Sequence, residues 1–436
     1  MPLSALRSSL VLFALAIALA GCTVGSGIAP SVSSGTGIRG NVHGGEQPIT
    51  GSAIALWAAG TTSTSGTVTP PSQLTPGGIT TDGSGNFSIT GDYTCPAPNS
   101  LVYLIAKGGN AGGGANNPQI ALMSLLGSCG SLTSSTYVVI NEETTVVAAA
   151  VTIGTNAGSF DTNYNIVGVQ EDNGVSLASA FSDAYEFINP ATGTVPGPVT
   201  PPGESGDVPS INTLADMLAA CVNSNGGVSG DGSACGNLFA ETAYPGGTGL
   251  GNQTLPPGPT PTDTLQAIAE FTFYTLQNKS VTGYGGNLLA LISATPPFLP
   301  VLSAVPTSWG IFPPGVTMLT ATASGDGIVH ISGPQGTAAF AVAAEVTNPT
   351  TPQLTLSATA APNTPIAVTM CQTNMVGQCL ATPATTVSIQ ATGSSNYVFS
   401  VFVTASGTIA GTPLYVNLND SNGNLIGSAS VTLTTN

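Results

Sequence analysis

The chain has 436 residues, of which 6% are charged, and its 20 acidic and 4 basic residues give a formal net charge of −16 at pH 7. A chain of this length is expected to form roughly two to four domains of about 100 to 200 residues each. Nucleic acid and anionic membrane surfaces repel so acidic a protein, so the composition excludes a nucleic-acid partner and provides no basic patch for membrane binding.

An apolar run from Leu10 to Ala20 follows Arg7 and ends in the sequence Leu19-Ala20-Gly21-Cys22. Residues 1–22 resemble the signal of bacterial lipoproteins with its lipobox. The resemblance implies cleavage before Cys22 and acylation of this cysteine, so that a lipid anchors the mature protein to a membrane of the bacterial envelope, in the periplasm or at the cell surface. An ordinary secretory signal is the alternative, and a transmembrane helix is disfavoured because the run is shorter than about 18 residues. Residues 23–36 are expected to form a flexible tether.

Six cysteines remain once Cys22 is set aside from the seven in the chain. In chain order they fall into three local pairs, and an oxidising compartment favours the closing of such pairs, each worth about 2.5 to 4 kcal/mol in the chain-entropy model. Other pairings stay open. A metal site is the weaker interpretation, because there is no C-x-x-C spacing and only His43 and His330 could assist. The predicted disulfides are Cys95–Cys129, Cys221–Cys235 and Cys371–Cys379.

Short β-rich runs separated by turns occupy residues 37–140. In the segment Thr81 to Ile89, Asp82 can accept hydrogen bonds from the turn backbone, and Phe87 and Ile89 then point to one face of a strand. Several short strands of this kind predict an antiparallel β-sandwich. The other predicted runs are Ile38 to Val42, Ala53 to Trp57, Leu101 to Lys107 and Tyr137 to Ile140, and Gly108 to Gly114 is expected to be a loop.

Three motifs in this region occur together in a fixed order. They are Gly37-Ile38-Arg39-Gly40-Asn41-Val42, then Pro48-Ile49-Thr50-Gly51-Ser52-Ala53-Ile54-Ala55-Leu56, then Thr81-Asp82-Gly83-Ser84-Gly85-Asn86-Phe87. This order resembles the carboxypeptidase regulatory-like, or transthyretin-like, domain of bacterial surface proteins. The sequence departs from that pattern at Ser52 and in a long insert from Gly60 to Gly78. The resemblance implies a non-catalytic spacer or a module that stabilises its neighbours.

Residues 141–312 change to helical patterns. Asn141 is suited to cap a helix, and Glu142 and Glu143 would lie in its first turn, where the helix dipole favours negative charge. Adjacent residues on a helix point about 100° apart, so we expect these two carboxylates not to share a site as acid and base. Further apolar stripes predict the core of a small helical domain, interrupted by a Pro- and Gly-rich linker at 191–209. The other predicted helices are Val175 to Ile188, Ile211 to Cys221, Thr262 to Gln277 and Asn287 to Ile292, with Cys235 in the loop behind the third.

The stretch from Ile211 to Trp309 also resembles a segment of surface lipoproteins of soil bacteria. The matching sequences run from Asn212 to Ser224, at Ala234-Cys235, from Pro261 to Ala267, from Pro297 to Pro300 and at Ser308-Trp309. The resemblance implies no activity. The resemblance includes related chains in which a β-propeller follows this segment, but no blade-length repeat follows it here.

Residues 313–436 return to short β-rich runs. The run Tyr397 to Val403 is nearly all apolar, as in the central strand of a sandwich, and Asp420 to Asn424 predicts a hairpin turn. This region resembles a bacterial immunoglobulin-like surface domain. The predicted fold is therefore multidomain and mainly β, with a transthyretin-like β-sandwich, a small α-helical domain and an Ig-like β-sandwich in that order. The other predicted runs begin at Thr317, Ile328, Ala338, Leu354, Ile366, Val387, Leu414 and Leu425.

Catalytic motifs are missing from the sequence. No G-x-S-x-G elbow, H-E-x-x-H helix or Walker loop occurs, and His43 and His330 occupy ordinary strand or loop positions. Four carboxylates could form a calcium site or a glycosidase pair, but their spacing supports neither, and no cofactor is implied. We expect a non-enzymatic envelope protein with a spacer or adhesion role. The alternatives are a glycan-binding module that uses Trp57 or Tyr103 and, third, a carboxylate-pair hydrolase. The four carboxylates are Asp161, Glu171, Asp172 and Asp183.

Overall fold

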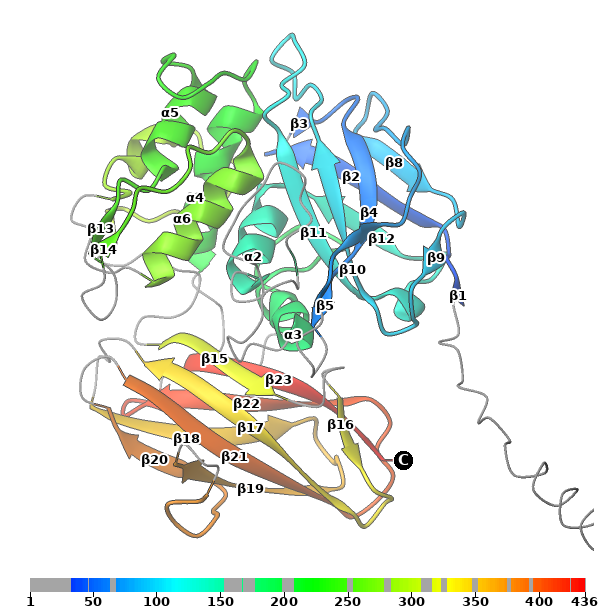
Figure 1. The fold of residues 1–436 in the computed structure, drawn as a ribbon, viewed down its shortest axis with the longest axis vertical. Coiled ribbons are helices and arrows are strands. Elements are labelled where there is room, and N and C mark those ends of the chain that lie inside the picture. The colour runs from blue at the N-terminus through cyan, green and yellow to red at the C-terminus, as the bar shows by residue number, and fades with distance from the viewer. Residues whose placement is uncertain are drawn as a thin grey trace, which may run out of the picture.

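The structure of the protein is a computed structural model. It describes residues 33–435 apart from 46, 63–67, 153–166, 168–176, 198–207, 249–253, 278–283, 307–315, 323–327, 347–351, 375–377, 392–394 and 424. Cys22, Asp161, Glu171 and Asp172 lie outside the described residues. The fold is mainly β, with one sandwich and a set of helices in the N-terminal part and a second sandwich below them (Figure 1).

The N-terminal sandwich has two principal sheets. One is antiparallel, with strand order β11-β10-β4-β7, and the other has the order β12-β2-β3, with β8 also paired to β2. Strand β12 runs parallel to β2, with Tyr137 opposite Arg39. The prediction of an antiparallel sandwich is therefore wrong for β12. The chain crosses to this strand from β11 in the other sheet and not through a hairpin, so β12 can run parallel to β2. The strands are β1 (Ser33–Ser34), β2 (Ile38–Gly44), β3 (Gln47–Pro48), β4 (Ala53–Ala58), β5 (Thr61–Thr62), β6 (Val68–Thr69), β7 (Ser72–Gln73), β8 (Asn86–Ile89), β9 (Thr94–Cys95), β10 (Leu101–Lys107), β11 (Ala121–Ser128) and β12 (Tyr137–Ile140).

Strands β10 and β11 are buried on both faces. On β10, Val102, Leu104 and Ala106 belong to the core between the two sheets. The alternate residues Tyr103 and Ile105 belong to a second core on the outer face of the same sheet. A strand that is buried on both faces needs no polar side chains at alternate positions. Strand β10 was still recognised by its Val, Tyr and Ile residues, whereas β11 has no β-branched or aromatic residue and was missed in the sequence.

Helices α2, α3 and α6 pack against this outer face, and all five helices α2 to α6 contribute to the core that lies on it. The helical domain expected at 141–312 therefore has no separate core, because the sheet supplies one side of it. Helix α4 begins within the predicted linker, and Cys235 lies on helix α5, not in a loop. The bounds are α2 (Glu142–Thr152), α3 (Leu177–Phe187), α4 (Val208–Val222), α5 (Ala234–Thr242) and α6 (Thr264–Gln277), with a 3-10 helix at Leu288–Leu291 and a short pair β13 (Gly247–Thr248) and β14 (Thr254–Leu255).

Backbone groups at the outer edge of β11 form hydrogen bonds with side-chain hydroxyl groups of helices instead of with another strand. Thr264 Oγ1 accepts a hydrogen bond from Ala121 N at 2.9 Å and donates one to Ala121 O at 2.7 Å. Met123 N donates to Thr145 Oγ1 at 3.0 Å. Further along, the Tyr185 hydroxyl donates to Leu126 O at 2.9 Å. Three helices thus pair with backbone groups of an edge strand that would otherwise be buried unbonded.

The C-terminal part is a β-sandwich of two sheets with a core of its own, as expected. The strand orders are β15-β17-β21-β19 and β16-β23-β22-β18-β20, and β21, which contains the predicted central run, lies between two strands. In the predicted hairpin turn, Asn422 N donates to Asp420 Oδ1 at 2.8 Å. The strands are β15 (Val316–Thr322), β16 (Ile328–Ile331), β17 (Thr337–Val346), β18 (Gln353–Ala360), β19 (Ile366–Thr373), β20 (Val387–Gln390), β21 (Ser395–Ala405), β22 (Thr412–Asp420) and β23 (Leu425–Thr435).

The three disulfides pair the cysteines as their order in the sequence predicts. They join Cys95 to Cys129, Cys221 to Cys235 and Cys371 to Cys379. Disulfides persist in oxidising compartments, so their presence indicates a protein outside the cytoplasm. None of the helices in the described part of the chain is long and apolar enough to cross a membrane.

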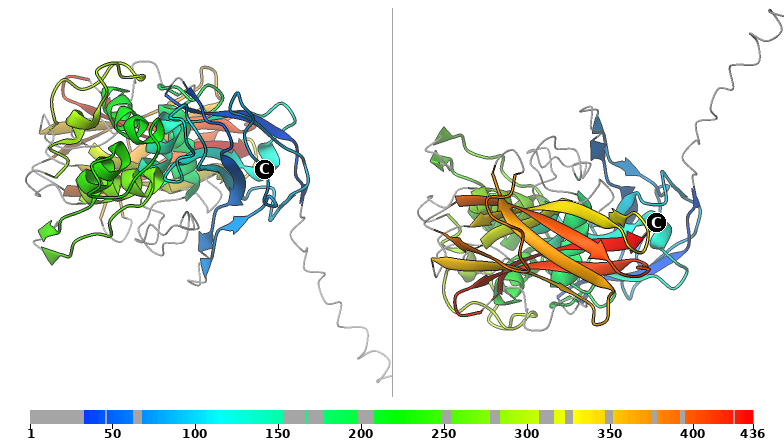
Figure 2. Two further views of the ribbon diagram at one scale, coloured as in Figure 1. Left: turned by 90° about the horizontal axis from the view of Figure 1, so that it is seen from above. Right: turned by 90° about the horizontal axis from the view of Figure 1, so that it is seen from below.

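Helix α3 lies at the junction between the two parts of the molecule. It packs against β11 on one side and against β15 and β23 on the other. Strand β1 and the C-terminal end of β23 lie on one side of the molecule, whereas α5 and the β13–β14 pair lie on the opposite side (Figures 1 and 2).

Candidate functional site

Three buried carboxyl groups gather where the helices meet the N-terminal sandwich. Glu142 and Glu143 begin helix α2, and Asp216 lies in the middle of α4, which packs against α2. Their side chains are 0%, 5% and 2% exposed, respectively. We call these three residues the carboxyl cluster.

Each carboxyl group of the cluster accepts a hydrogen bond from the backbone of a different loop. Gly45 N, in the turn after β2, donates to Glu142 Oε2 at 3.0 Å. The backbone of Val195 donates to Glu143. Phe298 N donates to Asp216 Oδ1 at 3.1 Å. The cluster therefore ties together three loops that are far apart in the sequence.

Burial and mutual repulsion make the charged form of the cluster unfavourable. Desolvation is the main cause in all three groups, and it raises the pKa of Glu142 to about 8, that of Glu143 to about 8 and that of Asp216 to about 6. Asp216 repels both glutamates, and Glu143 repels Glu142, while the backbone hydrogen bonds act in the opposite direction. At neutral pH the cluster consequently retains protons that exposed carboxyl groups would have lost.

This environment corrects the expectation that Glu142 and Glu143 serve only the helix dipole. Asn141 does cap the helix, since Thr144 N donates to Asn141 Oδ1 at 2.9 Å. However, every residue of α2 is buried, so side chains that point in different directions both end inside the protein. Asp216 on α4 then brings the two glutamates into one electrostatic group, because its charge repels both.

The turn after β2 requires glycine because it lies against the end of α4. A Cβ atom on Gly44 would lie 2.5 Å from Val222 Cγ1. Gly45 has φ +58°, and a Cβ atom there would lie 3.0 Å from the ring of Pro297. The close approach brings the Gly45 amide to Glu142 and leaves no space for a side chain.

One face of α4 also holds the segment that contains Phe298. Asn212 Nδ2 donates to Pro300 O at 3.1 Å, and Leu302 N donates to Thr213 Oγ1 at 2.8 Å. Together with the bond from Phe298 to Asp216, these contacts fix the segment along little more than one turn of the helix.

Two oxygens of the cluster, Glu142 Oε1 and Asp216 Oδ2, are buried and have no hydrogen-bond partner in the structure. A buried carboxylate oxygen without a donor is unfavourable, whereas a protonated carboxyl group carries its own donor. Among the described residues, no group of three or more His, Cys, Asp or Glu side chains is arranged to hold a metal ion. With at most 5% of any side chain exposed, the cluster also presents no carboxylate to a substrate from solution. The arrangement favours proton retention over metal binding or hydrolysis.

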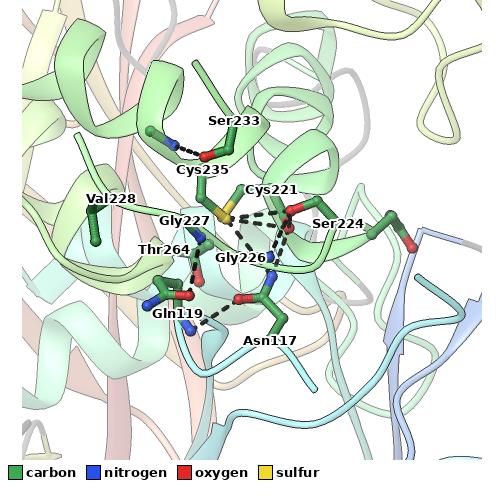
Figure 3. Close-up of a disulfide and its surroundings, with 12 residues drawn as sticks. Asn117, Gln119, Cys221, Ser224, Gly226, Gly227, Val228, Ser233, Cys235 and Thr264 are labelled. Atoms are coloured by element: carbon green, nitrogen blue, oxygen red, sulfur yellow. Dashed lines mark hydrogen bonds between the residues drawn. A yellow bond between two sulfur atoms is a disulfide. The ribbon is translucent and has the colours of Figure 1, made fainter. Parts of the chain in front are cut away.

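The Cys221–Cys235 disulfide lies at the end of α4 and adds a second tie to the sandwich (Figure 3). Asn117 is completely buried, and its Nδ2 donates to Cys221 O at 2.8 Å and approaches Cys235 Sγ at 3.7 Å. Gly227 N donates to Gln119 Oε1 at 3.3 Å. The loop that precedes β11 is thereby joined to the loop that the disulfide closes.

Those residues singled out in the sequence that the structure describes do not converge on one site. His43 Nδ1 contacts Gly45 O beside the cluster, and burial lowers its pKa, whereas His330 lies exposed on β16. Asp183 lies on α3, where burial raises its pKa and the backbone of Ser430 donates to it. The glycan-binding role of Tyr103 is excluded in this conformation, because the ring is 0% exposed and stacks on half-buried Trp57, with 6.5 Å between ring centroids.

Comparisons with known proteins do not identify a family. No protein-family model and no curated protein matches the chain, so the family resemblances of the sequence stay predictions. Solved structures that match in part include a PapD-like domain of human CEP192 (12% identity, 33% of this chain, 94% of that chain, TM-score 0.19). Others are the cupredoxin domain of amoB from Nitrosocaldus yellowstonii (10%, 28%, 89%, 0.19) and the CupB6 tip adhesin from Pseudomonas aeruginosa (8%, 93%, 84%, 0.18). Likenesses this distant carry no argument about the function of this chain.

Proposed function

We propose that the protein is a lipid-anchored protein of a bacterial envelope whose folded body has a structural or adhesion role. The supporting observation is the use of its cysteines. Six of the seven are joined in three disulfides, so the folded body contains the partners of all cysteines except Cys22. Cys22 is also the residue that the lipobox resemblance marks for acylation. A single cysteine in this position is suited to carry a lipid.

The proposal of a non-enzymatic role rests on how the polar groups of the body are used. The carboxyl cluster binds backbone amides of three loops, and its side chains are closed to solvent. Asn117 and Gln119 likewise bind backbone groups of neighbouring segments. These contacts support a rigid body, and they do not favour the hydrolase alternative. The glycan-binding alternative can no longer use Tyr103, because its ring is buried, and no specific observation favours Trp57 alone.

The positions of the chain ends indicate which side of the body would face a partner. Strand β1, which follows residues 23–32, lies on the same side as the end of β23 (Figures 1 and 2). The point where the tether joins the body is therefore on the side opposite α5 and the β13–β14 pair. That opposite side is the one that we propose to be most accessible to an envelope protein or a glycan.

Metabolic labelling tests the anchor. The full chain and a Cys22→Ser variant are produced in a bacterium that processes lipoproteins, with labelled palmitate in the medium. We expect label in the wild-type protein and in a Cys379→Ser control, and none in Cys22→Ser, which should move from the membrane fraction to the soluble fraction. Equal labelling of wild type and Cys22→Ser would contradict the proposal. Attachment of cells that carry the anchored chain, compared with cells that carry Cys22→Ser, then tests the adhesion role.

A further inference from the structure

We infer that the carboxyl cluster is a proton-operated latch for the three loops that it holds. When its carboxyl groups carry protons the loops are closed onto α2 and α4, and when the protons leave the loops are released. This inference goes beyond the proposed function and does not depend on the lipid anchor.

The hydrogen bonds of the cluster are complete only when protons are present. Each carboxyl group accepts a hydrogen bond from a backbone amide: Glu142 from Gly45, Glu143 from Val195 and Asp216 from Phe298. The remaining buried oxygens Glu142 Oε1 and Asp216 Oδ2 receive none. Protons on the cluster supply donors within this space, whereas full ionisation leaves several like charges there without counter-ions.

Among the described residues, the elements around the cluster offer no cation to replace those protons. The titratable side chains of the helices that pack against α2 are carboxyl groups and tyrosines: Asp183, Tyr185 and Glu186 on α3, Asp216 on α4, and Glu270 and Tyr274 on α6. On the sandwich side, His43 is partly buried, and burial lowers its pKa and so disfavours its cationic form, whereas Tyr137 on β12 is exposed. Arg39 and Lys107, which are the lysine and arginine residues in the described part of the chain, are exposed.

The direction of the switch follows from the two protonation states. As the pH rises through about 6, Asp216 is the first of the three to lose its proton, and both glutamates follow near pH 8. The charges then repel one another in a space that water does not reach. Opening a loop admits water and relieves the repulsion, so the open form gains population at alkaline pH. The closed form is favoured in an acidic medium.

Hydrogen exchange of the full chain measures the latch directly, because each loop contributes an amide that is bonded to the cluster. The reporter amides are those of Gly45, Val195 and Phe298. Exchange is followed by mass spectrometry from pH 5 to pH 9, and each rate is divided by the intrinsic rate at that pH. We expect protection at the reporters to fall by up to about tenfold per pH unit above pH 6 for each linked proton, while peptides of β21 stay protected. Constant protection at all three reporters would overturn the inference.

Amide substitutions separate the latch from a general loss of stability. Glu142→Gln and Asp216→Asn keep an oxygen for the loop amide and supply a permanent donor in place of the proton. We expect the reporter amides of these variants to remain protected at pH 9. The matched control is Glu241→Gln, since Glu241 is on α5 with its carboxylate bonded to exposed Asn287 Nδ2, and it should behave as wild type. If Glu142→Gln and Asp216→Asn both open with pH as steeply as wild type, protons on the cluster do not operate the latch.

Discussion

Thr145 shows how a single hydroxyl group can join a helix to a sheet. Its Oγ1 donates to Asn141 O at 2.6 Å and accepts from Met123 N at 3.0 Å, and the residue is fully buried. Replacement by valine keeps the shape but leaves the Met123 amide without a partner. We expect Thr145→Val to lower the free energy of unfolding by about 1 to 3 kcal/mol, measured by urea denaturation.

The matched control for Thr145 is Thr272 on α6. It is also buried, but its hydroxyl donates only within its own helix, to Ile268 O at 2.8 Å and Ala269 O at 3.1 Å. Those carbonyls belong to the helix and do not depend on the hydroxyl. We expect Thr272→Val to change the free energy of unfolding by less than about 1 kcal/mol. If both variants lose the same free energy of unfolding, the hydrogen bond between Thr145 and β11 does not contribute to stability beyond the bonds within a helix.

Glu142 is expected to make stability depend on pH. Burial raises its pKa from 4.5 to about 8, so the folded chain binds this proton more tightly than the unfolded chain does. Between these two values the folded state holds more protons, and stability therefore falls as the pH rises. Glu142→Gln should raise the free energy of unfolding at pH 8 by a few kcal/mol, on the order set by about 1.4 kcal/mol per pKa unit, and should change it little at pH 4. A gain of the same size at both pH values would show that ionisation is not the cause.

The sequence predicted the start of helix α2 but not the contact of its two glutamates with Asp216 in the carboxyl cluster. The cap at Asn141 and the helix that follows it could be identified from local pattern, because capping involves residues close in the chain. The meeting of Glu142 with Asp216 depends on how α2 packs against α4, and no local rule contains that information. The usable signal was Asp216 itself, the one carboxyl group of α4, which lies between the apolar residues Ala215 and Met217. A buried charge of this kind needs a partner or a proton.

At the scale of elements, the strands of the C-terminal sandwich were predicted well because their pattern is local. Each run of β-branched and aromatic residues ends at a turn, and the structure places a strand at every predicted run. Strand β11 and helix α5 were missed for different reasons. The first is buried on both faces, so it does not alternate, and it also has no β-branched or aromatic residue, whereas the second is short and lies among glycines. Tertiary packing decides both.

Two of the disulfides have similar expected entropic contributions to stability but different surroundings in the structure. Cys221–Cys235 closes a separation of 14 residues and Cys371–Cys379 one of 8, so the chain-entropy model assigns about 3 and about 2.5 kcal/mol. However, the first is buried in the core beneath the helices and receives Asn117. We expect the Cys221→Ala/Cys235→Ala double variant to lose clearly more than its entropic value in urea unfolding. The matched Cys371→Ala/Cys379→Ala variant should lose about its entropic value, and a reversed order would contradict the role given to Asn117.

At the scale of the whole molecule, the layers explain where the chain can be divided. The first core lies between the two N-terminal sheets, and the second lies between one of those sheets and the helices. Both cores include strands β10 and β11. The C-terminal sandwich has a third core to itself, and α3 contacts it from outside. A boundary near residue 313 therefore separates cores, whereas a boundary near residue 140 divides one.

This difference predicts how truncated chains behave. Residues 313–436 alone should fold and unfold cooperatively, because the core of this sandwich is complete. Residues 23–140 alone would expose the outer face of β10 and β11, including Tyr103, Ile105, Met123 and Leu125, and a contiguous apolar patch of that kind favours aggregation. Residues 23–312 restore the helices and should fold. Circular dichroism during thermal unfolding and binding of a hydrophobic dye distinguish the three chains. Cooperative unfolding of residues 23–140 without dye binding would show that the N-terminal sandwich is a domain independent of the helices.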